Sequence, residues 1–331
     1  MLNLVKKYQN AFSVSGYESE LAEMISKDLA NVWDGITVDP VGNVIVYKKG
    51  KDSSKKLMIA SHMDEIGFMV VNIEDNGMIR VAPIGGINAV ASCYHNVRFQ
   101  NGTTGILVVE DGTKFADITP NKLFVDIGAD TAAKAKRKVK VGDVCAIAPM
   151  FKKLSSKRYA SKAFDDRVCC AISAYAALNC GTPAYDTYFV FTVQEEVGCR
   201  GAKPSSFTVM PDYSIALDVT PAPACGNPNH LTAKLGNGAA IKIKDSSVIC
   251  SRKLVDRLTD LAEEKGIKYQ YEVLLAGGTD TSAMQIAGSG SHACCISLPT
   301  RYVHTPVETI DVDDLNACAA LLIAFIENGA E

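Results

Sequence analysis

Apolar and polar positions alternate along the chain with a period that changes twice, and each change marks a different kind of structure. From residue 16 to about 31, apolar residues recur every three or four positions. The preceding Ser15-Gly16-Tyr17-Glu18 has the form of a capping box, so the sequence predicts an amphipathic helix here. Apolar runs at 44–47 and 57–60 predict buried strands. The second strand leads directly into Ser61-His62-Met63-Asp64, which places a His-x-Asp pair at its carboxyl end.

Between Gly67 and about Leu154 the pattern changes to short β-rich runs separated by turn signals such as Asn76-Gly77 and Asn101-Gly102. This spacing is typical of a small barrel or sandwich. The predicted strands are 68–73, 78–82, 97–100, 104–109 and 144–148. We interpret residues 68–154 as a β-rich domain inserted into another domain.

Helical and strand patterns alternate again after Ala163. The predicted helices are 167–178, 251–266, a short one after Gly277-Gly278-Thr279-Asp280, and 313–327; the predicted strands are 187–193, 213–217, 268–273 and 293–298. Alternation of this kind favours a mixed sheet covered by helices. The predicted fold class is therefore α/β: a mixed sheet flanked by helices in a discontinuous domain of residues 1–67 and 155–331, with the small all-β domain inserted into it.

Composition and charge exclude several classes of protein. The 331 residues are 47% hydrophobic and 21% charged, with a mean hydropathy of +0.07, which fits a folded globular chain. A net charge of −3 without a basic run gives nucleic acid no electrostatic footprint. The longest apolar run, 317–326, is shorter than the ~20 residues that cross a bilayer, and the N-terminus lacks a secretory pattern. We therefore expect no membrane partner, a cytoplasmic location and reduced thiols for the eleven cysteines.

Histidines and carboxylates gather at the ends of the predicted elements, where ligands bind in open α/β sheets. Each has an ordinary explanation on its own: Asp165 and Asp166, for example, fit the N-cap of the helix that follows. Two adjacent carboxylates, Glu195 and Glu196, directly after a buried strand are harder to explain, because buried like charges are costly unless they are paired or bind a cation. The candidate residues are His62, Asp64, Asp165, Glu195, Glu196, Asp218 and His304.

Together these residues predict a metal centre. Two histidines and several carboxylates without a thiolate suit a divalent ion such as Zn²⁺, Co²⁺ or Mn²⁺. Five of the residues fill two open sites if one carboxylate bridges, and a pair of ions is a recurrent arrangement in hydrolases. Glu195 is adjacent to a ligand without being counted as one, so it is placed to take a proton from a water shared by the ions. The five are His62, Asp165, Glu196, Asp218 and His304.

In their order along the chain, these motifs resemble the tetrahedral aminopeptidases, a family of dinuclear metallopeptidases that includes members named glutamyl aminopeptidase, endoglucanase or cellulase M. The resemblance covers nearly the whole chain. It implies a zinc-peptidase/phosphorylase-like fold and an enzyme that removes the N-terminal residue of peptides. The motifs are Ser61-His62-Met63-Asp64-Glu65-Ile66-Gly67, Ala163-Phe164-Asp165-Asp166-Arg167-Val168, Gln194-Glu195-Glu196-Val197-Gly198, Leu217-Asp218-Val219 and Val303-His304-Thr305-Pro306-Val307-Glu308.

The resemblance also implies a role for each residue. Asp165 would bridge two divalent ions. His62 with Asp218 would bind one ion, and His304 with Glu196 would bind the other. Glu195 would be the general base on the bridging water, and Asp64 would stand behind His62. The inserted domain would pair protomers, and the dimers would build a dodecamer. The sequence departs from the family pattern just after Asp218, over residues 219–225 on the substrate side.

Three other functions are compatible with parts of this pattern. Metal-dependent carboxypeptidases and deacylases share the order of ligands, but their extra domain enters between the fourth ligand and the last histidine, whereas here the β-rich interval precedes Asp165. A glycoside hydrolase such as an endoglucanase needs two carboxyl groups across a cleft. Neighbours on one strand, as Glu195 and Glu196 would be, point to opposite faces, and Trp33, the one tryptophan, is far from every motif. A non-catalytic assembly protein would be favoured by a missing ligand, and all five are present.

Overall fold

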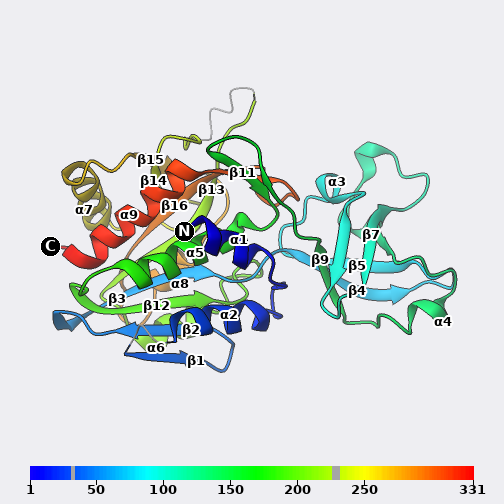
Figure 1. Ribbon diagram of the computed structural model, residues 1–331, viewed down its shortest axis with the longest axis horizontal. Helices are drawn as coiled ribbons and strands as arrows, with labels where there is room; N and C mark the ends of the chain where they lie inside the picture. The colour runs from blue at the N-terminus through cyan, green and yellow to red at the C-terminus, as the bar shows by residue number, and fades with distance from the viewer. Residues whose placement is uncertain (31–33, 226–231) are drawn as a thin grey trace.

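The computed structural model describes residues 1–30, 34–225 and 232–331, which form two bodies of secondary structure (Figure 1). The larger body is a mixed β-sheet covered by helices, and the smaller one is a closed β-barrel at one end of it. The α/β fold with a small all-β unit, predicted from the hydrophobic pattern, is confirmed.

Four parallel strands form the centre of the large sheet, in the order β12-β3-β13-β16. Most of each strand is buried because helices cover both faces, and this explains the nearly continuous apolar runs in the sequence. The four strands are β3 (Asp52–His62), β12 (Tyr185–Thr192), β13 (Tyr213–Pro221) and β16 (His292–Arg301).

Antiparallel pairing extends the sheet on both sides, and a further pair of strands branches from β16. On the β12 side these are β2 (Val44–Lys48) and β1 (Gly35–Val38); on the β16 side they are β17 (Glu308–Asp311), β11 (Arg158–Ser161) and β10 (Phe151–Lys153); the branch is β14 (Ala239–Lys244) with β15 (Tyr269–Val273).

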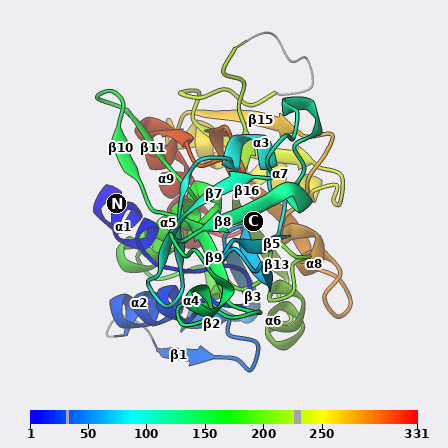
Figure 2. The same cartoon turned by 90° about the vertical axis from the view of Figure 1, so that its right-hand side faces the viewer.

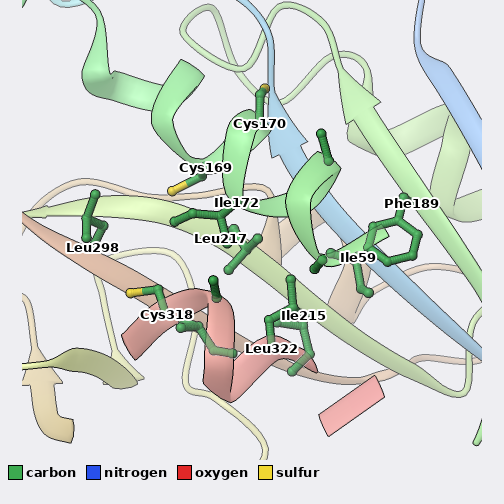
Figure 3. Close-up of a cluster of buried hydrophobic side chains, with 14 of the residues drawn as sticks. Ile59, Cys169, Cys170, Ile172, Phe189, Ile215, Leu217, Leu298, Cys318 and Leu322 are labelled. Atoms are coloured by element: carbon green, nitrogen blue, oxygen red, sulfur yellow. The ribbon is translucent and has the colours of Figure 1, made fainter. Parts of the chain in front are cut away.

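Helices lie on both faces of the sheet. The larger apolar core joins one face to α1 (Leu2–Gln9), α2 (Ser19–Leu29), α5 (Phe164–Asn179), α7 (Arg252–Glu264) and α9 (Val312–Asn328). Figure 3 shows this core around α5 and α9, with Ile172, Ile215 and Leu322 among its buried side chains. A smaller core joins the opposite face to α6 (Ala202–Val209) and α8 (Thr281–Gln285). Each fully buried aliphatic side chain contributes ~1.5–3 kcal/mol, so the two cores fix the strand ends in place.

The barrel closes in the order β4-β5-β8-β7-β6-β9 and faces the viewer in Figure 2. Closure leaves no free sheet edge, and the interior is filled by side chains such as Phe68, Phe99 and Leu107. Its elements are β4 (Gly67–Ile73), β5 (Ile79–Ile84), α3 (Ala89–Ser92), β6 (Asn96–Phe99), β7 (Thr104–Val109), β8 (Leu123–Asp126), α4 (Ala132–Ala135) and β9 (Val144–Ile147). Strand β10 lies within 68–154 yet pairs with β11 in the large sheet.

A buried ion cluster ties the segment that leads into the barrel to the start of α5. Glu65 lies just before β4, where the chain leaves the large sheet. Its carboxylate contacts Arg167 Nη2 of α5 at 2.5 Å and also pairs with Lys162, just before α5. All three side chains are almost completely buried, so each cation depends on this one carboxylate for neutralisation.

Several predictions of local structure are wrong. The capping box does not form: α2 starts at Ser19, the Ser15 hydroxyl donates to Asp64 Oδ2 at 2.6 Å, and Glu18 Oε1 accepts from the amides of Gly16 at 2.7 Å and Gln194 at 3.0 Å. The strand predicted at 213–217 continues to Pro221 and therefore contains Asp218. Residue 31, at the end of the predicted helix, and Trp33 lie outside the described residues. In the described ranges, no helix has the length and apolar content needed to cross a bilayer.

Candidate metal centre

Four strand ends and one helix start meet at a single edge of the large sheet. His62 is the last residue of β3, and Asp218 lies near the end of β13. The loop after β12 carries Glu195 and Glu196, the loop between β16 and β17 carries His304, and Asp165 lies in the first turn of α5. The structure thus brings all five predicted ligands together. Because Glu195 and Glu196 follow the end of β12, the opposite-face rule for strand neighbours does not apply to them.

Asp165 stands between the two histidines. Its Oδ1 lies 3.1 Å from His62 Nε2, and its Oδ2 lies 3.3 Å from His304 Nε2. On the far side of His304, the same Nε2 is 3.4 Å from Glu196 Oε1. Each oxygen of one carboxylate therefore faces a different imidazole.

Both imidazoles have their second nitrogen occupied. His62 Nδ1 donates to the Asp64 carbonyl oxygen at 3.1 Å and lies 3.4 Å from Asp64 Oδ1. His304 Nδ1 donates to the carbonyl oxygen of Gly86, in the barrel segment after β5, at 2.9 Å. With Nδ1 committed as a donor, replacing the Nε2 proton by a metal ion would leave the Nε2 lone pair facing the centre, which is the arrangement of metal-binding histidines.

Two further carboxylates position the backbone around the centre. Asp64 accepts the amide of Glu195 at 2.9 Å and that of Glu196 at 3.2 Å, so one buried side chain orients both glutamates. Glu308 accepts the amide of Asp165 at 3.0 Å and that of His304 at 2.9 Å. The sequence motif contained Glu308, but nothing in its pattern indicated that it would accept from two segments so far apart along the chain.

Backbone strain is concentrated at the same place. Ala163, Gln194 and His304 have φ values of 53°, 55° and 61°, in the left-handed region that non-glycine residues rarely adopt. Ala163 lies two residues before Asp165, Gln194 is next to Glu195, and His304 is itself a candidate ligand. Strained residues of this kind persist where the surrounding structure holds them for a function.

The centre also holds carboxylates away from water. Burial raises the pKa of Glu195 well above its ordinary range, and the charge of Asp218 raises it further. Burial likewise raises the pKa of Asp218, with the charge of Asp165 adding to it. For Asp165 burial acts in the same direction, but hydrogen bonds with the two histidines hold its pKa below the ordinary value. Mutually repelling buried carboxylates of this kind are stabilised by bound cations.

The donor atoms fall into three groups, which differ in part from the expected sets. The alternative N-cap role of Asp165 and Asp166 does not account for their contacts, because the Asp165 carboxylate faces the two histidines and, among the described residues, neither side chain accepts a hydrogen bond from an α5 amide. Asp166 instead accepts the His62 amide at 3.2 Å. Cys199 and Asp280 were missed, although Asp280 belongs to a sequence turn noted above. The groups are His62 with Asp166 and Asp218, Asp165 with Glu196 and His304, and Glu195 with Cys199 and Asp280.

An open cavity of about 850 Å³ leads to the centre. Its described wall includes the candidate ligands on one side, and Val219 and Pro221 from the segment that departs from the family pattern. Imidazole nitrogens with their tautomer fixed, carboxylate oxygens on both sides and access from solvent are what divalent ions such as Zn²⁺ or Co²⁺ require. The residues present therefore fit the metal centre that the sequence indicated.

A sheet edge with two oriented imidazoles and several buried carboxylates beneath a cavity defines a metal-dependent hydrolase of the α/β class. Comparison with known proteins narrows the class. Residues 42–321 match the M42 glutamyl aminopeptidases, and the chain belongs to that family. It is therefore an aminopeptidase, an enzyme that hydrolyses peptide bonds, and the resemblance stated from the motifs is confirmed.

Individual relatives agree over nearly the full length. The lysyl aminopeptidase of Pyrococcus furiosus is 33% identical over 341 residues, which cover 98% of this chain and 96% of that protein. An aminopeptidase from the archaeon Desulfurococcus kamchatkensis superposes with a TM-score of 0.94 at 36% identity, covering 99% of this chain and 94% of that one. The TET1 peptidase of Pyrococcus horikoshii, which can assemble into a tetrahedron or a large octahedral shell, gives a TM-score of 0.88 at 30% identity and 99% coverage of both chains.

Proposed function

We propose that the chain is a dinuclear aminopeptidase that holds two divalent ions, zinc or cobalt with manganese as the alternative. One carboxylate would bridge the ions, and one histidine and one other carboxylate would hold each ion. The observation that carries this proposal is the pair of contacts from Asp165 to the two Nε2 atoms, at 3.1 and 3.3 Å. The assignment is Asp165 as the bridge, His62 with Asp218 on one ion, and His304 with Glu196 on the other.

Glu195 is the general base of this proposal. Its Oε2 lies 4.0 Å from His62 Nε2, at the rim of the centre, while its Oε1 accepts a hydrogen bond from the Cys199 thiol at 3.3 Å. Two bound divalent ions would lower the pKa of a water molecule toward neutrality and polarise the scissile carbonyl. Glu195 takes the proton of the attacking water and passes it to the leaving amine. Asp64 supports this step by fixing the Glu195 amide and the His62 ring.

The inserted domain, residues 68–154, is proposed to pair protomers, leaving 1–67 and 155–331 as the catalytic domain. Twelve subunits would then form a shell from these dimers. The support is the similarity to the TET1 peptidase of Pyrococcus horikoshii, which can assemble into a tetrahedron. Light scattering of the wild-type protein tests this part: a mass near twelve subunits supports it, and a monomer contradicts it.

The activity is tested with a pool of free and N-acetylated peptides, using chelator-stripped protein with and without added Co²⁺ or Zn²⁺. The buried carboxylates beside the centre would receive the free α-ammonium of a substrate, which confines cleavage to the first residue. Mass spectrometry should show metal-dependent loss of single N-terminal residues from the free peptides only. Release of acetylated residues at the same rate would contradict the aminopeptidase mechanism and favour a deacylase.

A further inference from the structure

The cavity changes character away from the metal centre. Apart from the candidate ligands and Glu195, the described residues that line it carry no charged side chain. Aliphatic residues supply much of this wall, from β13, from the loop after β15 and from the loop before β17. They are Val219, Pro221, Leu274, Leu275, Ala276 and Val303.

The hydroxyl groups in the wall are already committed to the protein. Ser247 donates to Asp245 Oδ1 at 2.8 Å, Thr279 donates to Thr281 Oγ1 at 2.8 Å, and Ser282 donates to the Thr279 carbonyl oxygen at 3.1 Å. A carboxylate entering the cavity would have to break one of these bonds to gain a hydroxyl donor. A polar group that is buried without a hydrogen-bond partner loses the free energy of its hydration and gains nothing in return.

Two cations that do not line the cavity make contacts within the protein. Lys242 pairs with Glu272, and its Nζ lies 3.6 Å from Asp245 Oδ2, with all three side chains buried. Arg301, the cation nearest to His304 in sequence, directs its Nε to the Pro223 carbonyl oxygen at 3.2 Å. Neither Arg301 nor the exposed Tyr302 is among the described lining residues. Among the described lining residues, a glutamate side chain therefore finds no cation other than the histidines of the centre, and a lysine side chain finds no carboxylate other than the candidate ligands and Glu195.

We infer that this aminopeptidase selects peptides whose N-terminal residue is large, uncharged and apolar, such as leucine, methionine or phenylalanine, over those that begin with glutamate or lysine; this inference rests on the proposed function. The cavity is wide enough for such side chains, and the aliphatic wall gains by removing them from water. Its preference would thus differ from the activities named for the glutamyl aminopeptidases of its family and for its lysyl relative.

The test measures kcat/KM for tripeptides X-Ala-Ala, with X as leucine, methionine, phenylalanine, alanine, glutamate or lysine, using the full-length protein reconstituted with Co²⁺ or Zn²⁺. We expect leucine to exceed glutamate and lysine by about 100-fold and alanine by roughly 10-fold or more. Equal or faster cleavage at glutamate, lysine or alanine overturns the inference while leaving the aminopeptidase activity established. Failure to cleave any free peptide with either metal overturns both the inference and the proposed function.

A charge added to the wall sharpens this test. Leu275 is 64% exposed, so Leu275→Arg is compatible with folding and places a guanidinium at the cavity. It should raise kcat/KM for the glutamyl peptide relative to the leucyl peptide by roughly fivefold, the effect of a partly exposed ion pair. Ile249→Arg is the matched control, because Ile249 is similarly exposed, at 73%, but does not line the cavity. An equal change in both variants would show that overall charge, and not this wall, sets the ratio.

Discussion

Replacing Gly86 by alanine tests how tightly the barrel segment holds His304. A Cβ at Gly86 would lie 2.6 Å from His304 Nδ1 and 2.8 Å from Cε1. Because ordinary contacts are about 3.4 Å or longer, the imidazole has to retreat by roughly 0.8 Å. The backbone of Gly86 lies outside the left-handed region, so alanine adds this clash without conformational strain.

A displacement of that size exceeds what a metal ligand tolerates, since ligand distances are held within about 0.2 Å. Changes that misplace a ligand through its supporting residue lower metal affinity by ~10–100-fold, which corresponds to ~1.4–2.7 kcal/mol. We expect Gly86→Ala to weaken Co²⁺ or Zn²⁺ binding at one of two sites by this factor, with the other site less affected. Calorimetric titration of the metal-free protein separates the two sites.

The control is Gly35→Ala, because an added Cβ there meets nothing within 4 Å and the backbone is again outside the left-handed region. This variant should bind both ions as the wild type does. If Gly86→Ala also binds both ions with unchanged affinity, then either His304 is not a ligand or the barrel segment yields freely, and the argument from the Gly86 contact fails.

Three other perturbations have defined outcomes. Glu195→Gln should lower kcat by ~10²–10⁴-fold while metal content, measured by atomic emission, stays unchanged; loss of metal would make Glu195 a ligand instead of the base. Burial and the charge of Asp64 raise the pKa of Glu18 to about 7 from its ordinary 4.5, so the folded protein keeps a proton that the unfolded chain releases between these pH values. This carboxyl therefore makes the metal-free protein less stable as pH rises from 4.5 to 7, by up to ~3 kcal/mol, and urea unfolding should show a flatter pH profile in Glu18→Gln, which keeps the acceptor oxygen. Glu65→Gln leaves the buried Arg167 guanidinium without a carboxylate and should lower the free energy of unfolding by ~3–5 kcal/mol, against less than about 1 kcal/mol for Glu74→Gln in a more exposed ion pair.

The sequence predicts the buried parts of the fold better than its edges. The central strands β3 and β12 were predictable because both faces are covered and their apolar runs are nearly unbroken. Strands β10, β11 and β17 were missed because they are short and because β11 joins the sheet through β17, which is distant along the chain. Pairing of this kind depends on tertiary contacts, which local hydrophobic period does not encode.

At the site, sequence reasoning located the side chains and missed what holds them. His62 and Asp165 could be grouped because ligands collect where parallel strands end. Ser15 followed the pattern of a helix cap, but its hydroxyl is committed to Asp64 instead. Gly86 and Glu308 could not be predicted, because neither a carbonyl oxygen that orients a distant imidazole nor a carboxylate that orients a distant backbone amide leaves a periodic signal in the sequence.

The hydrogen bond from His304 to Gly86 would link metal binding to subunit association. Under the proposed assignments, His304 belongs to the metal centre and Gly86 to the unit that joins subunits. Linkage is reciprocal. If subunit contact fixes the barrel segment and thereby strengthens ion binding, ion binding strengthens subunit contact by the same free energy. Metal scarcity would then loosen the assembly, and dilution of subunits would release metal.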